Sequence, residues 1–75
     1  MSPDDAKGLR RLDPVRLVAI SPVSSRYGII SAESRGRVEA VVLDGFAQTG
    51  VVTVRVWFGG IHGIVEVSSW EIERT

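Results

Sequence analysis

The sequence predicts one small all-β domain of five strands, preceded by a short N-terminal arm. Seventy-five residues suffice for one hydrophobic core and not for two. After Pro14, short apolar or alternating runs are separated by polar or glycine-rich connections, which is the pattern of strands. Two of these connections close hairpins whose registers agree with each other. We therefore expect a domain over residues 15–75 behind an arm over residues 1–14.

The arm has the features of a short helix, with a disordered arm as the alternative. Ser2 can cap the helix and Pro3 suits its first position. Asp4 and Asp5 would then lie at the positive end of the helix. The helical pattern ends at Asp13, because a residue that precedes proline avoids helical backbone angles.

The strands follow the arm in order. The first is apolar on both faces, so it can cover an apolar sheet face, and a long polar connection over residues 21–34 follows it. Three further strands form a meander, and a last segment closes an edge that would otherwise stay open. The expected strands are Val15–Ile20, Arg37–Leu43, Val51–Phe58, Ile64–Ser69 and a final turn or strand over Trp70–Thr75.

The two hairpins of the meander predict a register. Symmetric closure of the loops 44–50 and 59–63 places the even-numbered valines of the middle strand opposite apolar partners. The outer face then carries an acid–base–acid row of Glu39, Arg55 and Glu66. The expected pairs are Val42 with Val52, Ala40 with Val54, Val38 with Val56, Arg37 with Trp57, Val56 with Val65 and Val54 with Val67.

A short motif in the first meander strand suggests a fold family. Residues 36–42 have the spacing Gly-x-Val-x-x-Val, and residues 52–56, 65–67 and 70–72 continue the strand order. This pattern resembles the SH3-like small barrels, particularly the KOW and Tudor-type members, over roughly the span 15–75. The resemblance implies a five-stranded SH3-like barrel with a short N-terminal helix or disordered arm. It also implies a module that binds protein, RNA or DNA through loops at one rim.

Composition excludes several classes of function. The chain has no cysteine, which removes disulfides, thiolate metal sites and a cysteine nucleophile. It has no apolar run long enough to cross a bilayer, and its acidic, polar start is unlike a secretion signal. We therefore expect a cytoplasmic protein, or a part of a virion assembled in the cytoplasm, with no membrane partner, no cofactor and no small-molecule substrate.

Catalytic chemistry is not expected either. His62 is the single histidine and lies in a glycine-rich turn without a neighbouring acid, and no Gly-x-Ser-x-Gly elbow is present. The ending Gly63–Arg74 is similar in layout to the type II dihydrofolate reductases, which are short SH3-like enzymes. The Val-Gln-Ile-Tyr stretch that lines that family's pore is replaced here by residues 65–68, Val-Glu-Val-Ser. We expect a protein that is not an enzyme and has no catalytic, cofactor-binding or metal-binding residues.

An apolar patch is the first candidate binding surface. The expected register places Trp57 and Ile64 on the outer face of the meander, beside Val41 and Leu43. A contiguous exposed apolar patch usually marks an interface, although the long loop or the arm can also cover it. The hypothesis is a non-catalytic interaction module that self-associates as a homo-oligomer or docks on a larger protein assembly, as an accessory, regulatory or phage structural protein.

Nucleic acid is the alternative partner. Arg26, Arg35 and Arg37 lie in or beside the long connection, together with Tyr27. Arginines beside an aromatic ring can hold RNA or DNA by phosphate contact and base stacking. The isoelectric point of about 6.6 is lower than that of a dedicated nucleic-acid binder, so a protein partner is the first hypothesis.

Overall fold

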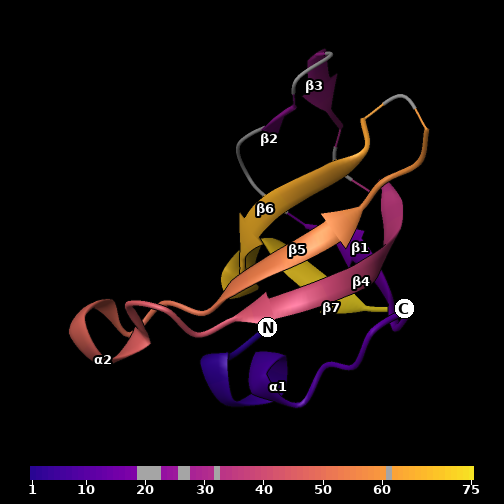
Figure 1. Cartoon of the computed structure of the whole chain (residues 1–75). Coiled ribbons are helices and arrows are strands. Elements are labelled where there is room, and N and C mark those ends of the chain that lie inside the picture. Colours follow the sequence, from indigo (N-terminus) through magenta and orange to yellow (C-terminus); the bar gives the residue numbers. More distant parts are fainter. Residues whose placement is uncertain (19–22, 26–27, 32, 61) are drawn as a thin grey trace.

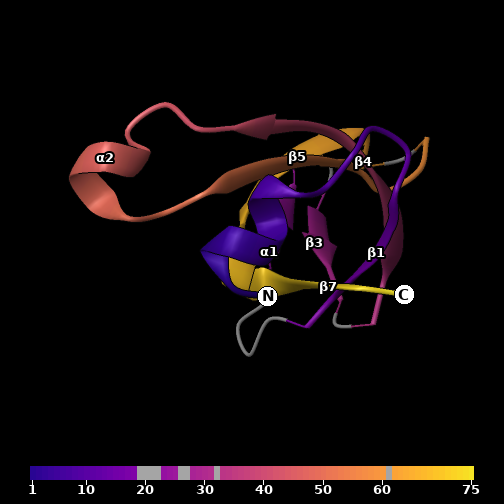
Figure 2. The same cartoon turned by 90° about the horizontal axis from the view of Figure 1, so that it is seen from below.

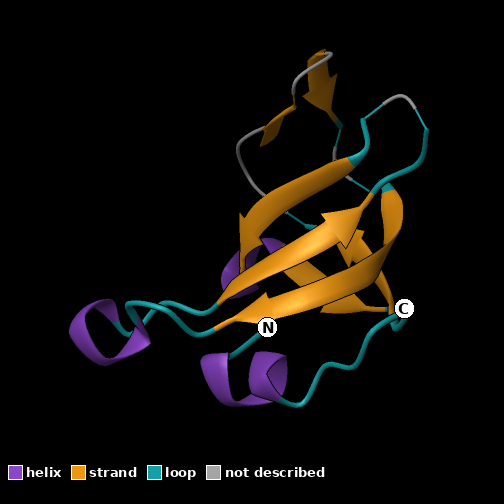
Figure 3. Ribbon diagram, in the orientation of Figure 1, coloured by secondary structure: helices purple, strands orange, loops and turns teal. Residues whose placement is uncertain are grey.

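The computed structural model describes residues 1–18, 23–25, 28–31, 33–60 and 62–75 (Figure 1). The described chain consists mostly of strands, in agreement with the expected all-β class, together with two short α-helices (Figure 3). The elements are α1 (Pro3–Lys7), β1 (Pro14–Leu17), β2 (Val23–Ser25), β3 (Gly28–Ile30), β4 (Arg35–Val42), α2 (Phe46–Thr49), β5 (Thr53–Trp57), β6 (Ile64–Ser68), the 3-10 turn η1 (Ser69–Glu71) and β7 (Ile72–Arg74).

Five strands form one antiparallel sheet in the order β6-β5-β4-β1-β7, and β2 pairs with β3 in a separate hairpin. The expected meander is therefore present as β4-β5-β6. The strand β1 does not lie across the meander but joins its edge next to β4, and β7 pairs with the other side of β1. The long connection, expected to be a polar loop, contains the β2–β3 hairpin.

The sheet is strongly curved, and the chain connectivity requires this curvature. Its two edge strands, β6 and β7, are consecutive in the chain and are joined by the three-residue turn η1. In a flat sheet five strands wide, the edge strands would lie about 19 Å apart. The four residue steps from Ser68 to Ile72 span at most about 14 Å. In Figure 2, β7 and β5 accordingly lie on opposite sides of the molecule, with β1 and β4 between them along the sheet.

The hairpin β5–β6 has the predicted register. Val54 pairs with Val67 and Val56 pairs with Val65, so the apolar face is continuous across the two strands. The outer-face pair of Arg55 with Glu66 is also present, with 3.7 Å between the guanidinium Nε and a carboxylate oxygen. The same register continues into the connection over residues 58–63, where the backbone N–H of Phe58 donates a hydrogen bond to the Gly63 carbonyl at 3.0 Å.

The hairpin β4–β5 follows the prediction only at one end. Its register shifts between Val38 and Ala40, which leaves Glu39 as an extra residue of a β-bulge. Glu39 consequently lies 3.8 Å from Arg11 of the arm instead of pairing with Arg55. Symmetric closure assumed equal strand lengths, and the bulge breaks that assumption. The pairs Arg37–Trp57 and Val38–Val56 are confirmed, whereas Ala40–Val54 and Val42–Val52 are wrong: Ala40 pairs with Arg55, Val41 with Val54 and Val42 with Thr53.

The arm contributes to the hydrophobic core. The helix α1 is present, with the Ser2 hydroxyl accepting a hydrogen bond from the backbone N–H of Asp5 at 3.2 Å. Ala6 and Leu9 are buried in the same cluster as the sheet residues. The arm is thus packed against the sheet rather than disordered. The buried apolar residues are Ala6, Leu9, Val15, Leu17, Ile30, Val38, Val52, Val54, Val56, Val67 and Ile72.

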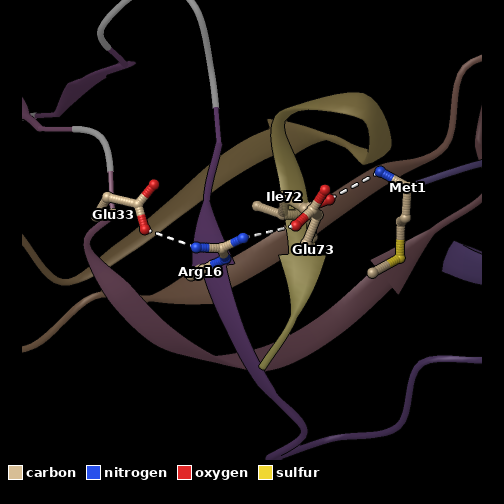
Figure 4. Close-up of polar contacts among 5 residues, drawn as sticks. All are labelled: Met1, Arg16, Glu33, Ile72 and Glu73. Carbon is tan, nitrogen blue, oxygen red and sulfur yellow. Dashed lines mark hydrogen bonds and ion pairs between the residues drawn. The ribbon is translucent and has the colours of Figure 1, made fainter.

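The chain start is held by hydrogen bonds. The Met1 ammonium donates to the carbonyl of Ser69 at 2.9 Å and to that of Ile72 at 2.8 Å. Figure 4 shows the second of these contacts. The Ile72 carbonyl belongs to the edge strand β7, which pairs with β1 on one side only. The ammonium therefore donates to a backbone acceptor that receives no hydrogen bond from a neighbouring strand.

Acetylation of the Met1 amino group should destabilise the fold. It removes the positive charge and leaves one N–H for two carbonyl acceptors, so the free energy of unfolding should fall by about 1–2 kcal/mol. Urea unfolding of the acetylated and the free chain at the same pH measures this difference. Equal unfolding midpoints would mean that the ammonium does not make these contacts in solution.

A surface ion-pair network joins β1, β7 and the segment before β4. The two Nη atoms of Arg16 lie 2.7 Å from a Glu33 carboxylate oxygen and 3.0 Å from one of Glu73 (Figure 4). The hydrogen bond that Arg16 donates to Glu73 and the charge of Glu33 raise the pKa of the Arg16 guanidinium above its ordinary value. Because these side chains are partly exposed to solvent, their pairing adds little to stability.

Candidate functional site

A pocket of about 290 Å³ brings together residues from both predicted binding surfaces. It lies where the first residues of β4 meet the end of β5. Trp57 comes from the predicted apolar patch, and Arg35 and Arg37 come from the predicted basic cluster. The pocket is lined by Pro14, Arg35, Gly36, Arg37, Trp57, Phe58, Gly59 and Thr75.

The outer face of the sheet beside the pocket carries a row of three residues on adjacent strands. Arg37 of β4 is the register partner of Trp57 of β5, and Trp57 is the partner of Ile64 of β6. Side chains of directly opposed residues lie about 5 Å apart at their Cβ atoms. Trp57 is 48% exposed and Ile64 is 54% exposed. The row therefore presents a cation, an indole ring and an aliphatic group side by side to solvent.

The arm positions the guanidinium of Arg37. Its Nη1 donates a hydrogen bond to the carbonyl of Leu12 at 3.1 Å. Leu12 has a φ of 75°, in the left-handed region, and its own N–H donates to the Val38 carbonyl at 2.7 Å. A left-handed conformation costs a non-glycine residue about 1–2 kcal/mol, so the contacts around Leu12 must offset this strain.

The strand β4 passes very close to β5 at Gly36. A Cβ atom at this position would lie 2.6 Å from the carbonyl oxygen of Trp57 and 2.7 Å from the nearest methyl carbon of Val56. No side chain fits there without a shift of the backbone. The glycine lets the two strands approach, and its neighbours Arg35 and Arg37 consequently border the same pocket as Trp57.

Among the described residues, the arginines of the pocket have no acidic partner. Within the described part of the chain, neither Arg35 nor Arg37 forms an ion pair, although the chain has equal numbers of acidic and basic residues. The pocket is thus bordered by two guanidinium groups that form no ion pair with any described carboxylate. The ion pairs of the other basic residues are Lys7–Asp4, Arg11–Glu39, Arg16–Glu33, Arg16–Glu73, Arg55–Glu66 and Arg74–Asp13.

Other residues of the predicted surfaces lie elsewhere. The bulge turns Val41 toward the core, where it pairs with Val54, so its expected place on the outer face is wrong. Leu43 is 50% exposed but follows the opposite end of β4, about 17 Å along the sheet from Trp57. Arg26 and Tyr27 lie outside the described residues. The structure therefore groups Trp57 and Ile64 with Arg35 and Arg37, and not with Val41 or Leu43.

Two features of the site were missed at the level of sequence. Phe58 lines the pocket while also packing against the core, and the Leu12 carbonyl holds Arg37 from a distant part of the chain. The contact from Leu12 has no sequence signal, because it depends on how the arm packs. A glycine inside a strand often marks a close approach, but the expected strand began at Arg37, and only the structure places Gly36 inside β4.

The described residues offer no other chemistry at this site. They include no group of three histidine, aspartate or glutamate side chains that could hold a metal ion. None of the described helices has the length and apolar character needed to cross a membrane. Comparison of the chain with protein-family models, with curated proteins and with solved structures finds no match. The function must therefore be inferred from the site itself.

Proposed function

We propose that this chain is a non-catalytic interaction module with an SH3-like barrel fold. The strand order β6-β5-β4-β1-β7 and the curved sheet support the barrel, because η1 joins the two edge strands directly. The all-antiparallel pairing is consistent with the same fold. On this proposal, binding occurs on the outer face of the meander and not in the core.

The observation that carries the proposal is the exposure of Trp57 beside Ile64. Both side chains lie on regular strands of a well-packed sheet, yet about half of each is in solvent. Tryptophan is enriched at the centres of protein interfaces, where its loss costs 2 kcal/mol or more as an order of magnitude. A protein partner, either another protein or a second copy of the chain, would cover this row.

A photo-crosslinking amino acid at Ile64 tests the proposal. We expect irradiation of the cells that produce the protein to yield a protein adduct. The substitution Trp57→Ala should reduce the apparent affinity of the chain for the crosslinked partner about 30-fold, because it removes the ring at the centre of the row. The matched control is Trp70→Ala, since Trp70 is 62% exposed but lies in η1, outside the row. Equal yields from both variants would refute the proposal.

Nucleic acid remains the second candidate. The specific observation in its favour is that Arg35 and Arg37 border the same pocket as the Trp57 ring, an arrangement that can contact a phosphate and stack on a base. In the same experiment this function predicts an adduct that nuclease degrades and that decreases steeply with added salt.

A further inference from the structure

We propose that the pocket of Arg35, Arg37 and Trp57 binds two carboxylates of an extended, acidic segment of a partner protein. This inference rests on the proposed function and names the chemistry of the partner. Its basis is the uncompensated charge of the two guanidinium groups, their spacing, and the apolar row that lies beside them.

The spacing of the arginines matches an extended peptide. Arg35 and Arg37 are two residues apart on β4, so they lie on the same side of the strand about 7 Å apart at their Cα atoms. A partner in extended conformation repeats its side chains on one side at the same distance. Carboxylates at alternate positions of such a segment can therefore meet both guanidinium groups at once. A guanidinium is planar and binds a carboxylate through two parallel hydrogen bonds.

Both guanidinium groups have donors available. Within the described residues, Arg35 makes no ion pair, and the Arg37 guanidinium makes a single hydrogen bond, from Nη1 to the Leu12 carbonyl. That contact orients the Arg37 side chain while leaving its second Nη free to bind. Trp57 lies directly opposite Arg37 on the same face of the sheet, so the aliphatic part of the acidic side chain that meets Arg37 can pack on the indole ring.

The charges of the chain argue against a second copy as the occupant of the pocket. The described chain does contain acids at alternate positions, Glu71 and Glu73, but both are already engaged. Glu71 accepts a hydrogen bond from the backbone N–H of Ser68 at 2.8 Å, and Glu73 binds Arg16. A partner copy would have to break these contacts to supply its carboxylates. Another protein with a free acidic segment does not carry this cost.

The same distribution of charge argues against a nucleic acid. A strand of RNA or DNA presents a phosphate at every nucleotide, and binders follow it with a track of cations. Here most other basic side chains of the described residues are neutralised by acids of the same chain. Two guanidinium groups beside one ring suit a short acidic motif better than a continuous polyanion.

A titration of the isotope-labelled chain by nuclear magnetic resonance tests the inference. The probe is a blocked peptide, Gly-Ser-Glu-Leu-Glu-Ser-Gly, and the control is the same peptide with glutamine in place of both glutamates. We expect millimolar peptide to shift the indole N–H of Trp57 and the amides of Gly36 and Gly59, which line the pocket. The indole N–H of Trp70 should not shift. The glutamine peptide should produce no saturable shift.

Matched variants assign the effect to the two arginines. Arg35→Gln and Arg37→Gln should each weaken peptide binding about fivefold, the upper value for a solvent-exposed ion pair. Arg10→Gln removes the same charge from an exposed residue that forms no ion pair in the described chain and lies outside the pocket. It should change the affinity less than twofold, as a rough bound for a distant, screened charge. The spectra themselves report whether each variant is folded.

Three results would overturn the inference. The first is equal binding of the glutamine peptide, and the second is equal loss in all three arginine variants. The third is a shift of the pocket resonances by an oligonucleotide of thymidines but not by the acidic peptide. If the peptide fails to bind while the crosslink from Ile64 still depends on Trp57, the protein-docking function stands and only the acidic partner is refuted. If both fail, the proposed function is refuted as well.

Discussion

Replacing Leu17 with alanine should lower the free energy of unfolding by about 2–5 kcal/mol. Leu17 is fully buried in β1, the strand that joins the meander to β7, and its register partner Ile72 is also fully buried. Truncation to alanine removes apolar contacts and leaves a cavity that a curved sheet joined through η1 cannot readily collapse. A domain of this length is stabilised by roughly 4–11 kcal/mol in total, so the loss is a large fraction of its stability.

Urea unfolding followed by circular dichroism measures this effect, with Leu43→Ala as the control. The control makes the same chemical change at a side chain that is 50% exposed and lies beyond the end of β4. It should change the free energy of unfolding by about 0.5 kcal/mol or less. Similar losses in both variants would contradict the assignment of Leu17 to the core.

The substitution Gly36→Ala should destabilise the domain by about 1–3 kcal/mol and disturb the pocket at the same time. The new methyl group would lie 2.6 Å from the Trp57 carbonyl oxygen, which is backbone and cannot rotate away. Either β4 or the end of β5 has to move. Because Arg35, Arg37 and Trp57 border the pocket from these two strands, their relative positions change with any such movement.

The control for this substitution is Gly60→Ala. A Cβ atom at Gly60 would contact nothing within 4 Å, and its φ is not in the left-handed region. The free energy of unfolding of the Gly60→Ala chain should stay within about 1 kcal/mol of that of the unchanged chain. Any change should be an increase, because alanine restricts the conformations of the unfolded chain. The indole resonance of Trp57 should move in Gly36→Ala and not in Gly60→Ala. A Gly36→Ala chain of unchanged stability would mean that the strands are farther apart than described.

Part of each candidate surface of the sequence, Trp57 of the apolar patch and Arg35 and Arg37 of the basic cluster, borders one pocket in the structure. The register had already placed Arg37 opposite Trp57, yet the arginines and the apolar patch suggested different partners. In the folded chain both groups border one pocket, because Gly36 allows β4 and β5 to approach closely. An indole ring beside unpaired guanidinium groups then favours a ligand that is partly apolar and partly anionic.

The sequence by itself determined those features that depend on neighbours in the chain. The Ser2 cap and the pairs of β5 with β6 could be predicted, because a cap and a short hairpin involve only nearby residues. The outward positions of Trp57 and Ile64 follow from the same alternation. The class of the domain also follows, since apolar residues recur with the period of strands.

Only the tertiary structure decided the features that depend on distant parts of the chain. The bulge at Glu39 has no local signal, since the arm supplies its partner Arg11, and this bulge moved Val41 to the core. The carbonyl of Leu12 reaches Arg37 only because the arm packs beneath the sheet. Contacts of this kind are set by the packing of the whole domain, in which a one-residue shift changes the face to which a side chain points.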